Sequence, residues 1–206
     1  MSVRQSRAQA KREQIRSAAQ TLFLAQGFER TTMDAITAAA GVSKQTLYHY
    51  YPGKEELFAD VLRALALDRV WEDMPLARLE ATPASREDLE RALLQIAQSL
   101  TRYLMEPTYV ALVRILVADA PQFPHLAEAF WDAVPTRGLA IFGGLLRRAS
   151  ESGLVNVRQP DLAVRLFVGS LLTYLLGGVF GATAQGVVPS REQLAELTRM
   201  FMRAIS

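Results

Sequence analysis

The sequence predicts an all-α protein with a small N-terminal head and a larger helical body, roughly nine helices in total. Three observations support this fold class. Apolar residues recur at the three- and four-residue spacing of helices along most of the chain. Glycine or proline separates these segments, and no stretch forms a convincing strand. The chain has 206 residues, 50% of them hydrophobic, which is enough to bury a core in each of two lobes.

The first predicted helix follows a basic N-terminal segment. Residues 1–11 are polar and cationic, so we expect a flexible arm that is not a secretory signal. From Arg12 to Gln26 the apolar residues keep helical spacing. Gly27 then supplies the left-handed residue that commonly ends a helix.

Two short helices follow, joined by a tight turn. Thr32 can N-cap a helix that continues to Ala40, and Gly41 ends it. Ser43 can cap the next helix, which the pair Pro52-Gly53 ends. A helix, a glycine-containing turn and a short helix have the spacing of a helix-turn-helix motif, so residues 12–53 are predicted to form a compact head.

Residues 54–206 are predicted to form a helical body. A fourth helix should run from Lys54 to Val70, and residues 74–85 form the least regular connection. Pro135 should kink or divide the helix in which it falls. The remaining predicted helices span residues 87–106, 109–118, 125–152, 161–182 and 191–205.

Charge is distributed unevenly along the chain. The segment up to Lys54 has eight basic and three acidic residues, which gives +5. Because the whole chain carries +2, the remainder carries +2 minus +5, or −3. A basic head on a mildly acidic body indicates a polyanionic partner at one end of the molecule.

The segment from Gly41 to Phe58, GVSKQTLYHYYPGKEELF, resembles the DNA-binding head of the TetR/AcrR family of bacterial transcriptional regulators. The likeness extends over Arg12 to Phe58, and residues 114–153 resemble more loosely the body of AefR-like members. The resemblance implies a homodimer whose head binds an inverted-repeat operator in double-stranded DNA. It also implies a repressor that a small apolar or amphipathic molecule releases from the operator.

The resemblance also implies a set of DNA contacts. Lys44 and Gln45 are the predicted base-reading residues, because lysine can donate to guanine and glutamine can pair with adenine. Lys44 can instead be an ordinary solvated lysine, and Thr32 can serve as a helix cap as well as a contact. The complete predicted set is Thr31, Thr32, Ser43, Lys44, Gln45, Thr46, Tyr48, His49, Tyr50 and Lys54. The basic arm either adds contacts to phosphates or the minor groove or stays a disordered tail.

Aromatic and isolated polar residues of the body are candidates for the wall of an effector pocket. The predicted pocket residues are Trp71, Tyr103, Tyr109, Arg114, Phe123 and Trp131, with His125 as a further candidate. Each of them can instead be a packing or surface residue. Arg114 either pairs with Asp119 or another carboxylate, or faces the cavity and binds an anionic or carbonyl-bearing ligand.

Residues 166–182 are apolar all round, which allows two interpretations. A membrane span needs roughly 20 apolar residues, so the length permits one. The amphipathic helix that follows favours a soluble homodimer, because the last two helices of each subunit form a four-helix bundle in the resembled family. We therefore predict a dimer interface and no membrane partner. The predicted interface residues are the small-residue ridge Gly169, Thr173, Gly177 and Gly181, together with Leu197 and Phe201.

Several functional classes are disfavoured by the composition. The absence of cysteine excludes disulfides, thiolate zinc sites and cysteine nucleophiles, and it fits a cytoplasmic protein. The chain has two separated histidines and neither a glycine-rich phosphate loop nor a metal-ligand cluster. We therefore predict no catalytic residue, no metal site and no cofactor. A small helical enzyme or carrier that uses a body cavity is the alternative, and a DNA-only architectural protein is a third reading.

Overall fold

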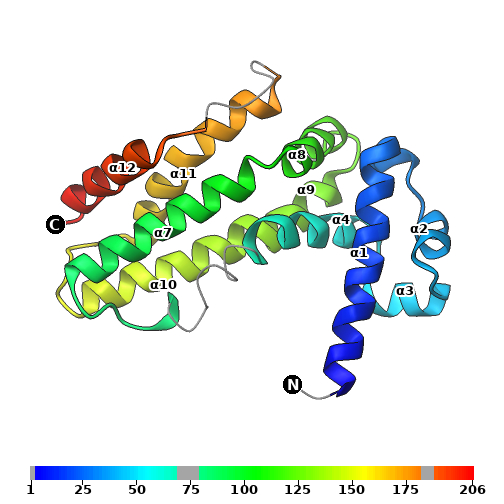
Figure 1. The fold of residues 1–206 in the computed structure, drawn as a ribbon, viewed down its shortest axis with the longest axis horizontal. Coiled ribbons are helices and arrows are strands. Elements are labelled where there is room, and N and C mark those ends of the chain that lie inside the picture. Colours follow the sequence, from blue (N-terminus) through cyan, green and yellow to red (C-terminus); the bar gives the residue numbers. More distant parts are fainter. Residues whose placement is uncertain (1–2, 69–78, 182–187) are drawn as a thin grey trace. The chain divides into compact units, whose positions relative to one another are not determined.

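The computed structural model describes residues 3–68, 79–181 and 188–206. The described residues form helices and turns and contain no strand, which confirms the all-α fold class (Figure 1). The chain divides into two compact units. The first comprises residues Met1–Ala64 and Ala111–Val134, and the second comprises Leu65–Val110 and Pro135–Ser206.

The first unit begins with three helices in the predicted order. They are α1 (Val3–Arg30), α2 (Met33–Ala40) and α3 (Lys44–Tyr50). α1 starts at Val3 rather than at Arg12, so the helix extends into the segment predicted as an arm. Gly27 has φ 79° and ψ 176°, which interrupts the helical backbone at the predicted position.

A cluster of three phenylalanine rings holds the first unit together. The Phe58 ring meets the edge of Phe23 at a centroid distance of 4.8 Å and that of Phe28 at 5.5 Å. All three side chains are fully buried. Edge-to-face pairs of this kind stabilise a core beyond the burial of their area, so they fix α4 (Lys54–Arg63) against α1.

The fourth helix ends earlier than the sequence predicts. α4 covers Lys54–Arg63, and the chain continues in a wider π-helical turn, Ala64–Asp68. Residues 69 and 70 of the predicted helix lie outside the described residues. α4 also packs against α9 (Pro124–Trp131), so α9 belongs to the same compact unit as the predicted head.

Pro135 divides the long predicted helix of residues 125–152, as expected. A π-helical turn, Asp132–Thr136, contains this proline and separates α9 from α10 (Arg137–Glu151). Proline lacks the N–H that an α-helix needs and its ring crowds the preceding turn. The wider turn accommodates both effects.

The described residues of the second unit include four long helices and part of a fifth. α7 (Arg86–Leu104) packs against α12 (Arg191–Ala204) and α11 (Pro160–Val179), while α11 also packs against α10. α8 (Pro107–Asp119) starts in this unit and continues into the first one. Ser190 caps α12 with a reciprocal capping box that includes Gln193.

α11 has one buried face and one uncovered apolar face. Its buried residues are Val164, Phe167, Leu171, Leu175 and Gly178. The opposite face, here called the α11 stripe, contains Leu162, Leu166, Gly169, Thr173, Leu176 and Phe180, which recur at three- and four-residue intervals. Leu166 is 62% exposed and Phe180 is 71% exposed, and a Cβ added to Gly169 would meet no atom of the described residues within 4 Å. By length and composition, α11 is also the one helix among the described residues that could cross a membrane.

Candidate nucleic-acid interface

The candidate interface is formed by α2 and α3, and N-terminal caps fix where both helices begin. The Thr32 hydroxyl accepts a hydrogen bond from the backbone N–H of Ala35 at 3.1 Å, and the Ser43 hydroxyl accepts one from that of Thr46 at 3.1 Å. Gly41, with φ 60° and ψ 39°, takes the left-handed conformation of the turn between the helices. The local sequence therefore fixes where α3 begins and how it follows α2.

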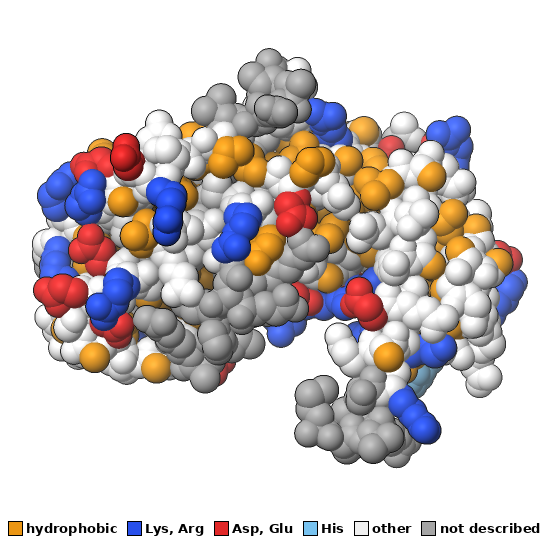
Figure 2. Space-filling model, in the orientation of Figure 1, with side chains coloured by type: hydrophobic (Ala, Val, Ile, Leu, Met, Phe, Trp, Pro, Cys, Tyr) orange, Lys and Arg blue, Asp and Glu red, His pale blue; other side chains and the backbone are white. Residues whose placement is uncertain are grey.

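α3 is anchored by one face and leaves the other open. Leu47 is fully buried, and Tyr51 directly after the helix is 2% exposed. The exposed face of α3 carries Lys44, Gln45, Tyr48 and His49, while Thr46 and Tyr50 are half-buried. Figure 2 shows several basic side chains on the lower part of the first unit, near the start of α1 and α3 in Figure 1. This arrangement is suited to entering a groove of a polyanion.

Lys44 is joined to an acidic side chain that the sequence analysis did not select. Its Nζ lies 2.8 Å from both Oδ1 and Oδ2 of Asp34, in the first turn of α2. Both side chains are 65% exposed. The hydrogen bond and the negative charge of Asp34 raise the pKa of Lys44. The only signal in the sequence was an acidic residue in the turn where the helix dipole favours one.

Thr31 lies in the interior rather than on the exposed surface. Its side chain is fully buried, and its hydroxyl lies 2.7 Å from the Gly27 carbonyl oxygen, to which it donates. The same hydroxyl accepts a hydrogen bond from Gln26 at 3.2 Å. Thr31 therefore closes the junction between α1 and α2, whereas Thr32 is exposed beside it.

Lys54, the first residue of α4, caps the C-terminal end of α1. Its ammonium donates to the carbonyl oxygens of Phe28 at 2.8 Å and Glu29 at 3.2 Å, and it lies 4.2 Å from the centre of the Phe28 ring. Desolvation lowers the pKa of Lys54. A cation at the C-terminal end of a helix complements the helix dipole, so Lys54 has a structural role besides the predicted phosphate contact.

The substitution Lys54→Met should lower the free energy of unfolding by about 1 to 2 kcal/mol, because it removes a charged donor from two carbonyls and keeps the apolar stem. Thermal unfolding of the variant measures this loss. If the predicted phosphate contact also exists, the salt dependence of DNA binding should fall by roughly one unit of slope. An unchanged unfolding temperature would contradict the capping role.

A buried polar network ties the end of α3 to α1 and α4. The Tyr51 hydroxyl donates to Asp60 Oδ2 at 2.6 Å, and Arg63 Nε donates to Asp60 Oδ1 at 3.0 Å. Arg16 Nη1 lies 3.8 Å from Asp60 Oδ2. Burial alone would raise the pKa of Asp60, but the bonds from Tyr51 and Arg63 and the charges of Arg63 and Arg16 hold this pKa below its ordinary value.

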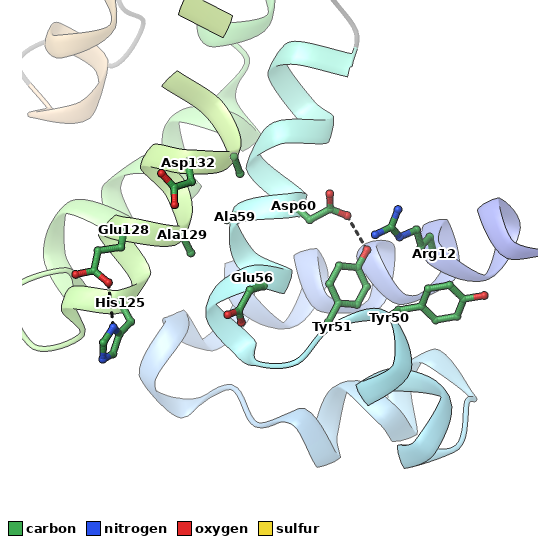
Figure 3. Close-up of a pocket in the computed structure, with 11 residues that line it drawn as sticks. Arg12, Tyr50, Tyr51, Glu56, Ala59, Asp60, His125, Glu128, Ala129 and Asp132 are labelled. Atoms are coloured by element: carbon green, nitrogen blue, oxygen red, sulfur yellow. Dashed lines mark hydrogen bonds and ion pairs between the residues drawn. The ribbon is translucent and has the colours of Figure 1, made fainter. Parts of the chain in front are cut away.

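A cleft of about 600 Å³ lies beside this network (Figure 3). Figure 3 shows the Tyr51–Asp60 bond on one side and the His125–Glu128 contact, 3.0 Å, on α9. The lining is rich in carboxylates, and its residues are Arg12, Tyr50, Tyr51, Glu56, Ala59, Asp60, His125, Glu128, Ala129, Asp132 and Ala133. Within the described residues no cluster of three or more acidic or histidine side chains is arranged to hold a metal ion.

The sequence matches two family models. Residues 15–61 match the model of bacterial regulatory proteins of the tetR family, and residues 91–205 match that of the AefR-like transcriptional repressor C-terminal domain. The second match alone covers more than half of the chain. The chain belongs to the TetR family of transcriptional regulators. The matched family and its relatives are transcriptional regulators and not enzymes, which confirms that prediction.

Individual TetR-family proteins are similar to this chain over most of their length. The transcriptional regulator SrpR of Pseudomonas putida is 31% identical over 193 residues, which cover 82% of this chain and 86% of SrpR. The solved structure of the flavonoid-responsive regulator FrrA is 30% identical, covers 95% of this chain and 96% of FrrA, and has a TM-score of 0.69. A TetR-family regulator from Mesorhizobium loti is 26% identical over 96% of both chains, with a TM-score of 0.69.

The predicted pocket residues of this TetR-family chain occupy different environments. Trp71 lies outside the described residues. Tyr109 is 2% exposed, and its burial raises the pKa of its hydroxyl. Phe123 packs edge-on against Phe28 at 5.3 Å. Arg114 is exposed on α8, Tyr103 is half-buried, and Trp131 is 53% exposed beside a shallow cleft on α9.

A second cleft of about 600 Å³ in the second unit was not anticipated from the sequence. It lies between the end of α7 and the start of α12 and has a mainly apolar lining. The buried Thr101 hydroxyl, on α7, lines the cleft and has no hydrogen-bond partner among the described residues. The other lining residues are Gln98, Arg102, Met105, Glu106, Pro107, Val188, Pro189, Arg191 and Leu194.

Some of the predicted dimer-interface residues lie on the surface, and others lie in the core of the second unit. Thr173 and Gly181 are exposed, and Gly169, Gly177 and Leu197 are half-buried. Phe201 is buried inside the second unit, where its ring lies 4.9 Å from that of Phe167. The exposed leucines of the α11 stripe were not selected from the sequence, although their spacing was visible in it.

Proposed function

We propose that this TetR-family protein is a ligand-responsive homodimeric repressor that binds an inverted-repeat operator and leaves it when a small apolar or amphipathic molecule binds. The observation that carries the proposal is the capped and anchored α3, with Lys44 and Gln45 on its open face. The match to an AefR-like repressor domain supports repression rather than activation. We place the protein in the cytoplasm, where it can reach bacterial DNA.

We propose that three consecutive segments of the chain have different functions. Residues 12–53 bind DNA, residues 1–11 supply supplementary basic contacts, and residues 54–206 bind the effector and form the dimer. The α11 stripe supports dimerisation, because an uncovered row of leucines and a phenylalanine needs an apolar partner. A second copy of this chain presents the same stripe, and a two-fold axis then places two α3 helices in successive major grooves.

The effector belongs to the class of small apolar or amphipathic molecules. FrrA, which is 30% identical over 95% of this chain, is described as flavonoid-responsive, and this supports a responsive body here. Binding must favour the conformation that is unable to bind DNA, since a ligand shifts an equilibrium only by its differential affinity. Couplings of about 1 to 3 kcal/mol are typical.

Selection of bound sequences from a random DNA pool at physiological salt tests this function. The purified protein should enrich an inverted repeat with half-sites roughly 34 to 36 Å apart, or a multiple of that distance. A panel of flavonoids and other small aromatic molecules can then be screened for release of the selected operator. Failure to enrich any sequence would refute a sequence-specific regulator.

The substitution Lys44→Ala should weaken operator binding and relax the preference at one base position. A good base contact discriminates by about 1 to 3 kcal/mol, so we expect a loss of about 5- to 150-fold. Titration of the operator and of its single-base variants measures both effects. Lys11→Ala on α1 is the control for the loss of a lysine: a contact from the basic arm to phosphate should affect every duplex by a similar factor, so base preference should stay unchanged. Base preference retained in Lys44→Ala would refute the assignment.

A further inference from the structure

The Lys44–Asp34 pair joins the two helices of the helix-turn-helix motif on its exposed surface. Both carboxylate oxygens of Asp34 lie 2.8 Å from Lys44 Nζ, so the ammonium is held by two acceptors at once. Lys44 is the first residue of α3, where the helix dipole disfavours a cation. Asp34 lies in the first turn of α2, where the dipole favours an anion. The negative charge of Asp34 therefore offsets the unfavourable position of the Lys44 cation at the start of α3.

The pair contributes little to the stability of the motif. Both side chains are 65% exposed, and ion pairs at such sites contribute little to the stability of a fold. Lys44 can therefore leave Asp34 without disturbing α2 or α3. Guanine offers two acceptors, O6 and N7, on its major-groove edge, which matches the two oxygens that the ammonium leaves.

We propose that Asp34 is a specificity-determining residue that restrains Lys44, so that the ammonium leaves the carboxylate for a guanine edge but not for a phosphate. This inference rests on the proposed function. At a non-cognate site the base edge offers Lys44 no equivalent pair of acceptors, and Asp34 holds it back from neighbouring phosphates. Without Asp34, the same lysine is free to bind a phosphate and to recover affinity at the wrong site.

The carboxylate also opposes binding to DNA of any sequence. Affinity for random DNA arises almost wholly from phosphate charge, whereas operator affinity also includes base contacts. A negative charge on the exposed face weakens both kinds of binding by a similar factor. The ratio of the two affinities therefore rises through the restraint of Lys44 alone.

The test compares Asp34→Asn with the wild-type protein on the selected operator, its single-base variants and a scrambled duplex of equal length. Affinity for the scrambled duplex should rise about two- to four-fold, the effect of one charge about 5 to 8 Å from a phosphate in water. Operator affinity should rise less, and preference should fall at the base that depends on Lys44. In a Lys44→Met background, Asp34→Asn should no longer alter that preference.

Two controls make the outcome decisive. Asp34→Glu keeps the charge and should keep the selectivity, which separates restraint from any change in the stability of α2. Glu151→Gln, at the end of α10 in the second unit, removes an equal charge and should leave selectivity unchanged. Unchanged base preference in Asp34→Asn, or the same change in the Lys44→Met background, overturns the inference. If the wild-type protein enriches no sequence, the proposed function itself fails.

Discussion

Replacement of Asp60 by alanine should lower the free energy of unfolding by about 3 to 5 kcal/mol, the cost of removing one partner from a buried charged group. The side chain of Asp60 is 13% exposed, and those of Arg16 and Arg63 are 10% and 16% exposed. The substitution removes the carboxylate that faces both guanidinium groups and accepts the Tyr51 hydroxyl. Chemical denaturation followed by circular dichroism measures the loss.

Two more conservative variants, Tyr51→Phe and Asp60→Asn, separate the contributions of the hydrogen bond and the charge to this loss of stability. Tyr51→Phe removes one hydrogen bond and should cost about 1 kcal/mol. Asp60→Asn keeps the shape and removes the charge, so its loss should lie between those of the other two variants. A loss of less than 1 kcal/mol in Asp60→Ala would show that the network contributes little.

Acid should weaken the same network. Because the pKa of Asp60 is held below the ordinary value, its contribution is fully present above a pH of about 4 and is lost as the pH falls through the folded-state pKa. The difference in stability between the wild-type protein and Asp60→Asn should therefore shrink below that pH. A constant difference down to strongly acidic pH would contradict the assignment.

Charges introduced on the α11 stripe should convert the proposed dimer to monomers. Leu166 and Leu176 are 62% and 49% exposed, so lysine at both positions leaves the protomer folded but would bury four cations in a two-fold interface. Operator affinity should then fall by about 100- to 10,000-fold, because the second α3 no longer binds at high effective concentration. Sedimentation equilibrium and operator titration measure the two effects.

Val117→Lys is the matched control for this double variant. Val117 is 50% exposed on α8 and lies outside the stripe, so its replacement should leave the assembly unchanged. A double variant that remains dimeric would show that the stripe faces something other than a second copy.

Local signals in the sequence were sufficient for the helix-turn-helix. Thr32 and Ser43 act as caps through bonds to residues three positions ahead, and Gly41 needs only its own backbone freedom. Pro135 likewise disrupts the α-helix only within the single turn that contains it. Predictions of this kind depend on a few neighbouring residues and are therefore accessible without tertiary information.

Interactions between distant residues were not accessible in the same way. Lys54 reaches a carbonyl 26 residues earlier, and Asp34 meets Lys44 ten residues later, because the helices are placed by their shared core. The end of α4 at Arg63 was also missed, since the following Ala-Leu-Ala-Leu has high helix propensity and gives no stop signal. The pocket prediction relied on residue type alone, which does not specify which side chains line a cleft.

The short recognition helix has a consequence for how such a protein changes over time. Seven residues are too few to form a stable helix alone, so α3 depends on Leu47 and Tyr51, which are buried, and on its Ser43 cap. Its outward residues are exposed and contribute little to that stability. Under the proposed function, in which Gln45 reads a base, substitutions at Gln45 would therefore redirect the protein to a new DNA sequence while the fold is retained, so that operator choice could evolve independently of folding.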